Sequence, residues 1–555
     1  MNDPGVVVAA VLVALSARLG WAAPLPLLAA VVALAALRRN PTLVAVALVM
    51  VVGVRSDASS SALDAPLPDR VVGTAQLVSD PEWTTFGTSV EVRIGGRRWQ
   101  AGVERADEWV LRPLLTGDHV VLSGRPRAME TAPEGWRRSR HLAGRLDVTR
   151  LERGPPAAPW FRLANSVHRL LSRGADSFDV EGRALFLGLV VGDDRAQSDV
   201  ARFRFQASGL RHLLAVSGQN VAFVLLLARP LMRRWGLRAG VVVAMSVLAV
   251  FVLVTRAEAS VLRASAMAAV ALIAGAAGRV ASGARILSLA IIGLLLVDPL
   301  LVEGLGFQLS VCATVGLLVG VRALSERLRG PVWFRDAVAC TLAAQLATAP
   351  LLIGLSGGVP SVATVANVLA VPAAGAVMVL GLTVGLASGL VVAPVAAVAQ
   401  LPTRALLWWI NGVASAGSHA TLPLLGPGRL AAIVTAGALL LLRSRLGGRP
   451  VRRRLVAVAV AVLVAGALRP VTPPDGAVEV IPGVVTGTSE CGRTVSLERR
   501  VDVIDALTAL QELGVVEADV VIGPAVSSTV EVAEQLMAQP VLRTATAEVP
   551  CTVTP

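Results

Sequence analysis

Acidic side chains are scarce and arginines are frequent in the long apolar stretch between residues 210 and 469. This stretch contains 22 arginines but five carboxylates, which are Glu258, Asp298, Glu303, Glu326 and Asp336. All five fall at the ends of predicted membrane spans or in the loops between them. Because transporters driven by protons or sodium place ionisable groups inside the membrane, this pattern argues against such a transporter. It favours an anionic substrate, although arginines in loops also orient membrane proteins.

Polar residues inside the predicted spans form five short groups. The first is Arg211–Val221, whose Ser, Gly, Gln and Asn can break a helix and expose backbone donors to an anion. The others are centred on Arg263, Gln308, Gln345 and Asn367. Each group alone is typical of hydrogen bonds between helices, worth about 0.6 kcal/mol. Together they predict a polar seam through a helical bundle, with the candidate pathway residues His212, Ser217, Gln219, Asn220, Arg263, Gln308, Gln345 and Asn367.

The overall composition is that of a membrane protein with several spans. Of the 555 residues, 54% are hydrophobic and 16% are charged, whereas soluble domains carry about 25% charged residues. The formal net charge is +13, and the chain contains no lysine. Guanidinium groups suit bidentate contacts with phosphate, but a GC-rich coding sequence produces the same bias.

No catalytic residue, metal or cofactor is predicted. The four cysteines show no CxxC spacing, which argues against a zinc or redox site. Cys491 and Cys551 fall on the predicted outer side, where they either form a disulfide or remain free thiols. No GxxxxGK[ST] phosphate loop occurs in the sequence, so energy for any transport must come from a partner.

The membrane-embedded parts are predicted at residues 1–55 and 181–469. Residues 1–55 hold the apolar runs Val6–Leu19, Leu25–Leu37 and Leu43–Val54. We interpret these runs as anchoring helices and not as a signal peptide, because no basic residue precedes the first run. The later spans are expected near residues 212–232, 239–255, 258–277, 285–300, 306–324, 335–355, 428–443 and 452–468, with two more within 361–400. About 13 crossings result, and the shorter ones can be re-entrant.

Clusters of arginine give this map an orientation. They fall on one side of the membrane if the N-terminus is cytoplasmic. The clusters are Arg38/Arg39, Arg233/Arg234/Arg238, Arg279/Arg285, Arg322/Arg327/Arg329 and Arg443/Arg445/Arg449/Arg452/Arg453/Arg454. Residues 71–153 and the tail from residue 470 then both lie outside the cytoplasm.

Residues 71–153 have the alternating pattern and frequent turns of a small β-barrel or sandwich outside the bilayer. Arg93, Arg97, Arg98 and Trp99 place positive charge beside an aromatic ring. Barrels hold single nucleic-acid strands with such basic and aromatic groups, so these four residues are DNA-contact candidates. A solvated strand edge gives the same pattern.

Two further segments complete the predicted architecture. Residues 159–180 resemble an amphipathic helix at the membrane surface, with Trp160, Phe161 and Leu163 on its apolar side and His168 as an interfacial side chain. Residues 470–555 have an α/β pattern. The predicted fold is therefore a polytopic α-helical membrane protein with an inserted small β-barrel and a short α/β C-terminal tail.

The order of the motifs resembles the ComEC family of competence membrane channels. The resemblance covers residues 180–400 most strongly, and LTGDHVVLSGRPR (Leu115–Arg127) is similar to the family's OB-type domain. One departure is Gln219-Asn220, where the family usually has a Leu-His pair, so any role of that histidine is not carried over. The motifs are GLVVGDDRAQ (188–197), GLRHLLAVSGQNV (209–221), ASVLRA (259–264), VDPL (297–300), GFQLS (306–310), AAQLATAPLL (343–352) and ANVLAVP (366–372).

The resemblance implies that one strand of DNA passes through the membrane during natural transformation. Many family members end in a metallo-β-lactamase-like nuclease domain, and Leu510–Thr529 resembles the segment that leads into its HxHxDH motif. At the ligand positions this chain has Gly523, Ala525, Ser527 and Ser528, and the tail contains no histidine. These residues cannot replace imidazole and carboxylate around zinc, so the tail is interpreted as a degenerate remnant without nuclease activity.

The leading hypothesis is a non-enzymatic channel for single-stranded DNA in the bacterial cell membrane. Residues 71–153 would form an OB-like guide and residues 181–469 the channel. The implied partners are single-stranded DNA, the lipid bilayer, a separate DNA-receptor protein and a cytoplasmic ATP-driven translocase. The alternatives are an envelope scaffold that transports nothing, and an exporter of another anionic or lipid substrate.

The predicted orientation can be tested with reporter fusions. A reporter inserted at Gly96 and one at Thr488 should both report the outer side of the membrane, because the arginine clusters place the intervening loops inside. A cytoplasmic signal from either position would contradict the assignment.

Overall fold

The computed structural model describes most of the chain up to residue 436 and parts of the remainder. The two compact units are residues 1–195, 215–319 and 375–403, which form unit 1, and residues 196–214, 320–374 and 404–555, which form unit 2. The described residues are 3–20, 30–31, 34, 41–84, 87–129, 132–214, 216–234, 236–356, 358–420, 424–433, 435–436, 462–464, 478–482, 484–489, 492–497, 503–513, 515, 518, 520–523 and 542–543.

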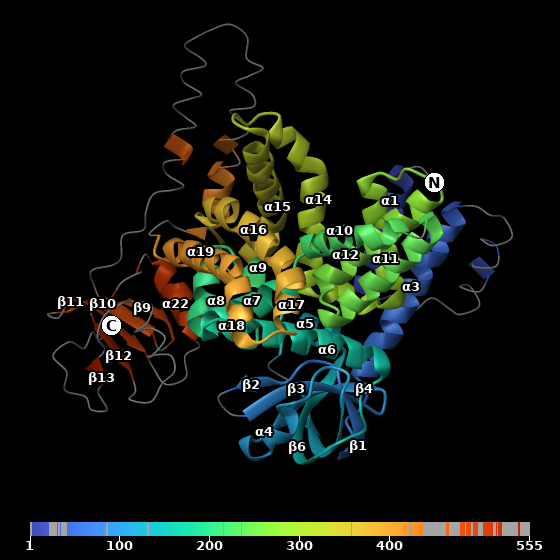
Figure 1. Cartoon of the computed structure of the whole chain (residues 1–555), viewed down its shortest axis with the longest axis horizontal. Coiled ribbons are helices and arrows are strands. Elements are labelled where there is room, and N and C mark those ends of the chain that lie inside the picture. The colour runs from blue at the N-terminus through green and yellow to red at the C-terminus, as the bar shows by residue number, and fades with distance from the viewer. Residues whose placement is uncertain are drawn as a thin grey trace, which may run out of the picture. The chain divides into compact units, whose positions relative to one another are not determined.

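Unit 1 contains a closed five-stranded barrel. Its strands follow the order β1-β5-β6-β4-β3, and β1 pairs with β3 to close the circle. The β4–β6 pair is parallel and the other pairs are antiparallel, which is the arrangement of an OB fold. The strands are β1 (Val71–Leu77), β3 (Gly87–Ile94), β4 (Arg97–Val103), β5 (His119–Arg127) and β6 (Leu142–Arg153), with β2 (Glu82–Thr84) paired to β3 (Figure 1).

Alternation along the strands fills the barrel with apolar side chains. Val90 and Val92 of β3 point into the same core as Ala101 and Val103 of β4, because successive residues of a strand face opposite sides. Short helices connect the strands: η1 (Arg105–Asp107), α4 (Glu108–Leu111) and α5 (Glu134–Ser139).

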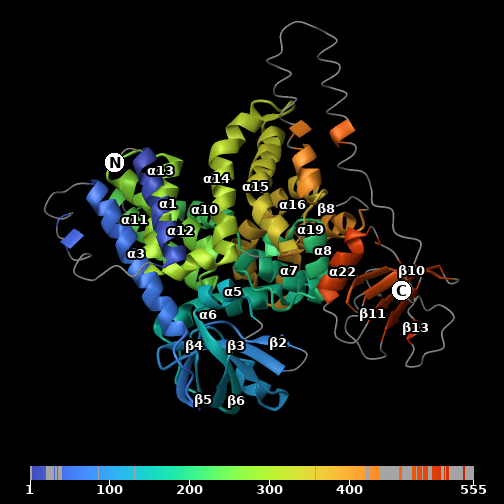
Figure 2. The same ribbon diagram turned by 180° about the vertical axis from the view of Figure 1, so that it is seen from behind.

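The helices of unit 1 pack around a second apolar core, to which α1, α3, α13 and α14 contribute. Helix α3 leads from this core toward the barrel (Figure 2). The helices are α1 (Asp3–Leu19), α3 (Pro41–Leu63), α6 (Pro159–Gly174), η2 (Ala175–Ser177), α7 (Val180–Val191), α10 (Gly218–Arg234), α11 (Gly236–Val254), α12 (Ala259–Ala276), α13 (Gly283–Val297), η3 (Pro299–Glu303), α14 (Leu305–Ser325, which extends into unit 2), the π-helical turn η4 (Gly381–Gly385), α17 (Leu386–Ser388) and α18 (Ala393–Ala399).

Unit 2 combines helices with a C-terminal sheet. The sheet order is β13-β12-β11-β10-β9, parallel from β11 to β13 and antiparallel from β9 to β11. The elements are α8 (Asp199–Ala207), α9 (Arg211–Leu214), α15 (Val332–Ser356), β7 (Val359–Pro360), α16 (Ala363–Leu380, which extends into unit 1), α19 (Leu401–Ser418), β8 (Leu424–Leu425), β9 (Val478–Ile481), β10 (Val484–Ser489), β11 (Gly492–Leu497), α22 (Val503–Glu512), β12 (Val520–Gly523) and β13 (Leu542–Arg543).

Helix α8 completes the core of the C-terminal sheet. Val200, Phe203 and Ala207 of α8 belong to one apolar cluster with residues of β10, β11 and α22. The spacing of these three residues places them on one face of the helix. The C-terminal end of α8 packs closely against α19. A Cβ built on Gly417 of α19 would lie 2.7 Å from the Cβ of Ser208.

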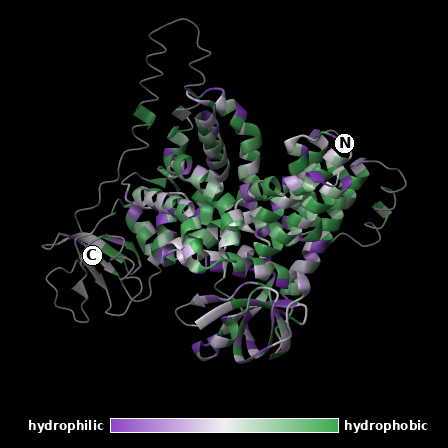
Figure 3. Ribbon diagram, viewed as in Figure 1, coloured by the Kyte–Doolittle hydropathy of each residue, from purple (hydrophilic) through white to green (hydrophobic). Residues whose placement is uncertain are grey.

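Six of the described helical stretches are long and apolar enough to cross a membrane. Figure 3 shows that hydrophobic residues dominate the helices, whereas the barrel mixes both kinds. The expectation of about 13 crossings is not confirmed. Residues 363–388 form one such stretch where two crossings were expected, because the π-helical turn continues the helix and α18 has seven residues. The runs 25–37, 428–443 and 452–468 lie largely outside the described residues.

Helix α6 is amphipathic, with exposed apolar side chains and two buried polar ones, and its place at the membrane surface stays a prediction. Trp160 and Leu163 are exposed, whereas Asn165 and His168 are buried. The interpretation of His168 as an interfacial side chain is therefore wrong. The helix lies against the barrel (Figure 1), where it supplies polar groups to an ion network.

Gly117 sets the distance between the barrel and α6. Its φ is +92°, and a Cβ built on it would lie 2.2 Å from Phe161 Cγ of α6. Gly117→Ala should therefore lower the free energy of unfolding by more than the 1–2 kcal/mol that a left-handed L-residue costs. Thermal unfolding of the detergent-solubilised protein measures the loss.

Gly96→Ala is the matched control. Gly96 has a φ of +78° but nothing within 4 Å of its built Cβ, so this variant carries backbone strain without the clash. Equal melting temperatures for the two variants would contradict the proposed contact.

Candidate functional site

Arg263 of α12 is a buried arginine surrounded by uncharged groups. Its side chain is 8% exposed, its Nε donates to Ser310 Oγ of α14 at 2.6 Å, and one terminal nitrogen lies 3.1 Å from Met267 Sδ. The other terminal nitrogen lies over Gly218 of α10, 2.8 Å from a Cβ built there. Three of the polar groups from the sequence, at residues 217–220, 260–263 and 306–310, therefore meet around one guanidinium.

Hydrogen bonds hold the turn that passes beneath Arg263. Ser260 Oγ donates to the Val216 carbonyl, and Asn220 Nδ2 donates to the Leu189 carbonyl at 3.1 Å. Ser217 Oγ lies 3.4 Å from Asn220 Oδ1. Gln219 is exposed, and its Nε2 is 3.5 Å from a Cβ built on Gly375. The turn is thus fixed by backbone acceptors, and no anionic partner for Arg263 lies in the part of the chain that the structure describes.

The remaining pathway candidates do not all join this group. Gln308 Nε2 donates to the Val302 carbonyl at 2.8 Å and so ties α14 to η3. Three candidates belong to unit 2. His212 is exposed on α9, and Gln345 Oε1 accepts from Thr364 Oγ1 at 2.8 Å. Asn367 is buried, and its Oδ1 has no hydrogen-bond partner among the described residues.

The four barrel candidates have different environments. Arg93 is exposed and Arg98 is half-buried on the outer face, while Arg97 donates to the Pro66 carbonyl at 3.1 Å. Trp99 is 2% exposed inside the barrel core. Its prediction as a DNA contact is wrong, because a ring sealed in the core cannot stack on a base.

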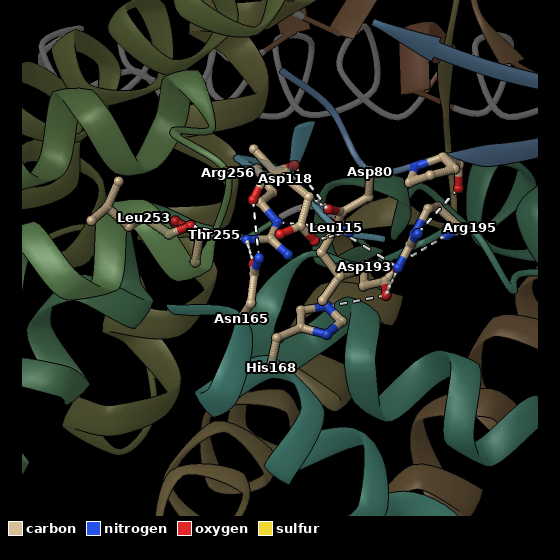
Figure 4. Close-up of polar contacts among 12 residues, drawn as sticks. Asp80, Leu115, Asp118, Asn165, His168, Asp193, Arg195, Leu253, Thr255 and Arg256 are labelled. Atoms are coloured by element: carbon tan, nitrogen blue, oxygen red, sulfur yellow. Dashed lines mark hydrogen bonds and ion pairs between the residues drawn. The ribbon is translucent and has the colours of Figure 1, made fainter. Parts of the chain in front are cut away.

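An ion network that the sequence analysis missed joins the barrel to the helices (Figure 4). Asp80, in the loop after β1, accepts from Arg256 Nε at 2.9 Å and from the Thr116 amide at 2.7 Å. Arg256 also donates to Asn165 Oδ1 of α6 at 2.9 Å, and Asn165 Nδ2 donates to the Thr116 carbonyl at 3.1 Å. The barrel, α6 and the α11–α12 loop thus share one set of polar contacts.

A second carboxylate extends this network. Asp193, in the loop after α7, accepts from Arg195 at 2.7 and 2.8 Å, and its other contact is His168 Nε2 at 3.2 Å. Arg195 in turn lies 3.7 Å from Asp80 and donates to the Pro81 carbonyl at 3.1 Å. Two aspartates therefore face two arginines, so the buried charges balance apart from any charge on His168.

The network keeps both carboxylates ionised. Burial alone would raise the pKa of Asp80, but Arg256, Arg195, His168 and the Thr116 amide lower it below its ordinary value of 3.8. Burial would likewise raise the pKa of Asp193, but hydrogen bonds from Arg195 and His168 and their charges hold it well below that range. A lowered pKa stabilises the fold above the ordinary carboxyl pKa, and this contribution is lost as the pH falls through the folded-state value.

Backbone strain marks the same junction. In the described part of the chain, the non-glycine residues with a left-handed backbone are His141, Arg256 and Ala257. Arg256 enters the network above, and His141 Nε2 lies 2.8 Å from Asp298 Oδ2 at a second contact between barrel and helices. Arg138 and Glu303 add an ion pair of 3.5 Å there. Such strain persists only where surrounding contacts hold it.

Sequence signals for this network existed but were weak. Asp193 and Arg195 lie in the motif GLVVGDDRAQ, whereas Asp80 and Arg256 looked like ordinary turn and loop residues. Among the described residues, no group of three or more His, Cys, Asp or Glu side chains could hold a metal ion. Cys491, Cys551, Ala525, Ser527 and Ser528 lie outside the described residues.

A comparison with protein-family models gives a match. Residues 189–447 match the family model Competence, described as "Competence protein". This range is somewhat less than half of the chain and does not include the C-terminal sheet. No curated protein and no solved structure matches the chain.

Asp80→Asn should loosen the barrel from the helices. The change keeps the size of the side chain but leaves Arg256 buried without its carboxylate, and breaking a buried pair costs about 3–5 kcal/mol. We expect a lower melting temperature and faster proteolysis of the 154–158 connection between β6 and α6.

Asp69→Asn, at an exposed position with the same change of charge, serves as the control. If both variants melt at the wild-type temperature, the network does not hold the barrel in place.

Proposed function

We propose that the protein is a membrane channel that passes single-stranded DNA into the bacterial cell. The similarity to a competence family suggests a role in DNA uptake, and six membrane-length helices suggest a membrane protein. The observation that carries the finer proposal is Arg263, a buried guanidinium at the meeting point of three polar motifs, with no carboxylate partner among the described residues.

The surroundings of Arg263 favour an anion as its missing partner. In the described residues, no carboxylate lies within ion-pair distance of its guanidinium. Glu258 precedes it by five residues and lies outside the helix, as the N-cap residue of α12. A guanidinium has five N–H donors, and the contacts to Ser310 and Met267 leave others free. A phosphate group can accept two of these in a bidentate contact.

The position of Arg263 in α12 also suits a DNA pathway through the helical bundle. It is the fifth residue of the helix, about 6 Å along the axis from the first at 1.5 Å per residue. An arginine that faced lipid at the centre of the bilayer would cost about 2.5–3.5 kcal/mol. Burial against Gly218 and Ser310 avoids lipid and keeps the charge near one end of the span, where a strand would enter the bundle.

The other parts of the proposal follow from the same chemistry. The barrel would guide the strand outside the cytoplasm, and the net charge of +13 suits a polyanion. The channel would act without catalysis of its own. It would work with a separate DNA receptor and with a cytoplasmic ATP-driven translocase.

Arg263→Ala should abolish DNA uptake while the amount of membrane-inserted protein stays near normal. Arg263→Lys should retain part of the activity, because the charge persists without the bidentate fork. Gly218→Ala should reduce uptake less than Arg263→Ala, since a methyl group there displaces the guanidinium without removing its charge. Transformation frequency, normalised to inserted protein on immunoblots, measures all three.

Arg229→Ala is the control, because Arg229 is an exposed arginine on the neighbouring helix α10. If Arg263→Ala lowers the inserted protein as much as it lowers uptake, Arg263 has a packing role and the channel proposal loses its main support.

A further inference from the structure

We propose that unit 1 binds a monovalent metal cation between the C-terminal end of α6, helix α17 and the start of α19. The ligands would be the side-chain oxygens of Ser388, Gln400 and Thr403, together with the carbonyl oxygen of Gly174. We call these four oxygens the buried oxygen site. The inference goes beyond the proposed function, because it concerns an ion held inside the protein and not a substrate that passes through it.

The three side chains of this site are buried and leave oxygen atoms unused. Ser388 is 3% exposed, and Gln400 and Thr403 are 0% exposed. Ser388 Oγ, Gln400 Oε1 and Thr403 Oγ1 have no hydrogen-bond partner in the described part of the chain. Because buried polar groups nearly always have a partner, these three oxygens point to a ligand.

Other hydroxyl groups in the helices of this chain behave differently. A serine or threonine in a helix can satisfy its hydroxyl by donating to the carbonyl four residues earlier. The threonines that make this bond include Thr255, Thr314, Thr341, Thr348 and Thr383. Ser388 and Thr403 do not make it. Their hydroxyls are therefore available to an occupant of the site.

Close contacts bring the four groups to one interface. Gln400 Nε2 donates to the Gly174 carbonyl at 3.3 Å and lies 3.6 Å from a Cβ built on Gly385. Ser388 follows Gly385 by three residues, and Thr403 follows Gln400 by three. Residues with this spacing are neighbours on the surface of a helix. The Gln400 amide therefore shares one interface with both hydroxyls.

Glycines allow this close approach, and an aromatic ring closes the site. A Cβ built on Gly174 would lie 2.1 Å from the Gly385 carbonyl oxygen. A Cβ built on Gly385 would lie 2.8 Å from Phe186 Cζ of α7, and Phe186 is 0% exposed. The site is thus shielded from water on the side of α7. Such surroundings strengthen the attraction between an ion and the dipoles around it.

The electrostatics of the site favour a cation of low charge. Helix α6 ends at Gly174, and the C-terminal end of a helix carries partial negative charge. Helix ends and freed carbonyls hold sodium ions in membrane transporters. Arg173 and Arg404, which adjoin the site in sequence, are both exposed. All four ligands are neutral, whereas divalent ions in proteins bind carboxylates, so a monovalent cation fits best.

The test is the melting temperature of the full-length protein in nanodiscs, measured at equal ionic strength in NaCl, KCl and choline chloride. We expect it to be higher by about 2 °C in NaCl, in KCl or in both than in choline chloride, because a ligand that binds the folded state stabilises it. The increase should grow with the cation concentration. Ser388→Ala and Thr403→Val each remove one ligand oxygen and should abolish this dependence.

Thr403→Ser keeps the hydroxyl and should keep the cation dependence, so it separates the loss of a ligand from damage to packing. Thr383→Val is the matched control, because the Thr383 hydroxyl already donates to the Val379 carbonyl.

Equal wild-type melting temperatures in the three salts would overturn the cation. If Ser388→Ala and Thr403→Val then still lower the melting temperature, the occupant is an ordered water. A cation dependence that survives in both of these variants would also overturn the site, because the ion would bind elsewhere. These measurements contain no DNA, so their outcome leaves the proposed function untouched.

Discussion

The arrangement of unit 1 depends on the carboxylate of Asp80. This group extends from the barrel into a space lined by α6 and the loops that carry Arg195 and Arg256, and it contacts both arginines. Without its charge, two buried guanidiniums would share the single carboxylate of Asp193. The network therefore fixes where the barrel sits against the helices, and the left-handed backbone at Arg256 and Ala257 is held by the same contacts.

The contacts with the helices engage two loops of the barrel. The loop after β1 and the segment before β6 are the regions with which OB folds commonly bind oligonucleotides, and here both also contact the helices, through Asp80 and His141. In the proposed function, a strand bound by these loops would lie beside the helical part of the same unit. In that proposal, Arg263 would offer the strand a buried guanidinium in the same unit.

The fold was more predictable from the sequence than the site. Runs of apolar residues predicted the long helices, and alternation predicted the strands of the barrel, because both patterns arise from local burial. The same alternation already places Trp99 with Ala101 and Val103, which face inward. The ion network was not predictable, since Asp80, Asn165, Asp193 and Arg256 meet only after the barrel has docked. The expectation of about 13 crossings stays unconfirmed, and apolar length alone did not reveal that residues 363–388 form one helical stretch.

The apolar cluster that α8 shares with the C-terminal sheet forms late during synthesis of the chain. Phe203 of α8 leaves the ribosome about 300 residues before Leu507 of α22, its neighbour in the same apolar cluster. At 5–20 residues per second, this interval lasts roughly 15–60 s. During that time the apolar face of α8 has no partner from α22, although the helices that follow it are already being inserted. This cluster is therefore complete only after the C-terminal sheet has been synthesised, and a chain that ends before α22 would leave the apolar face of α8 without its neighbours from α22.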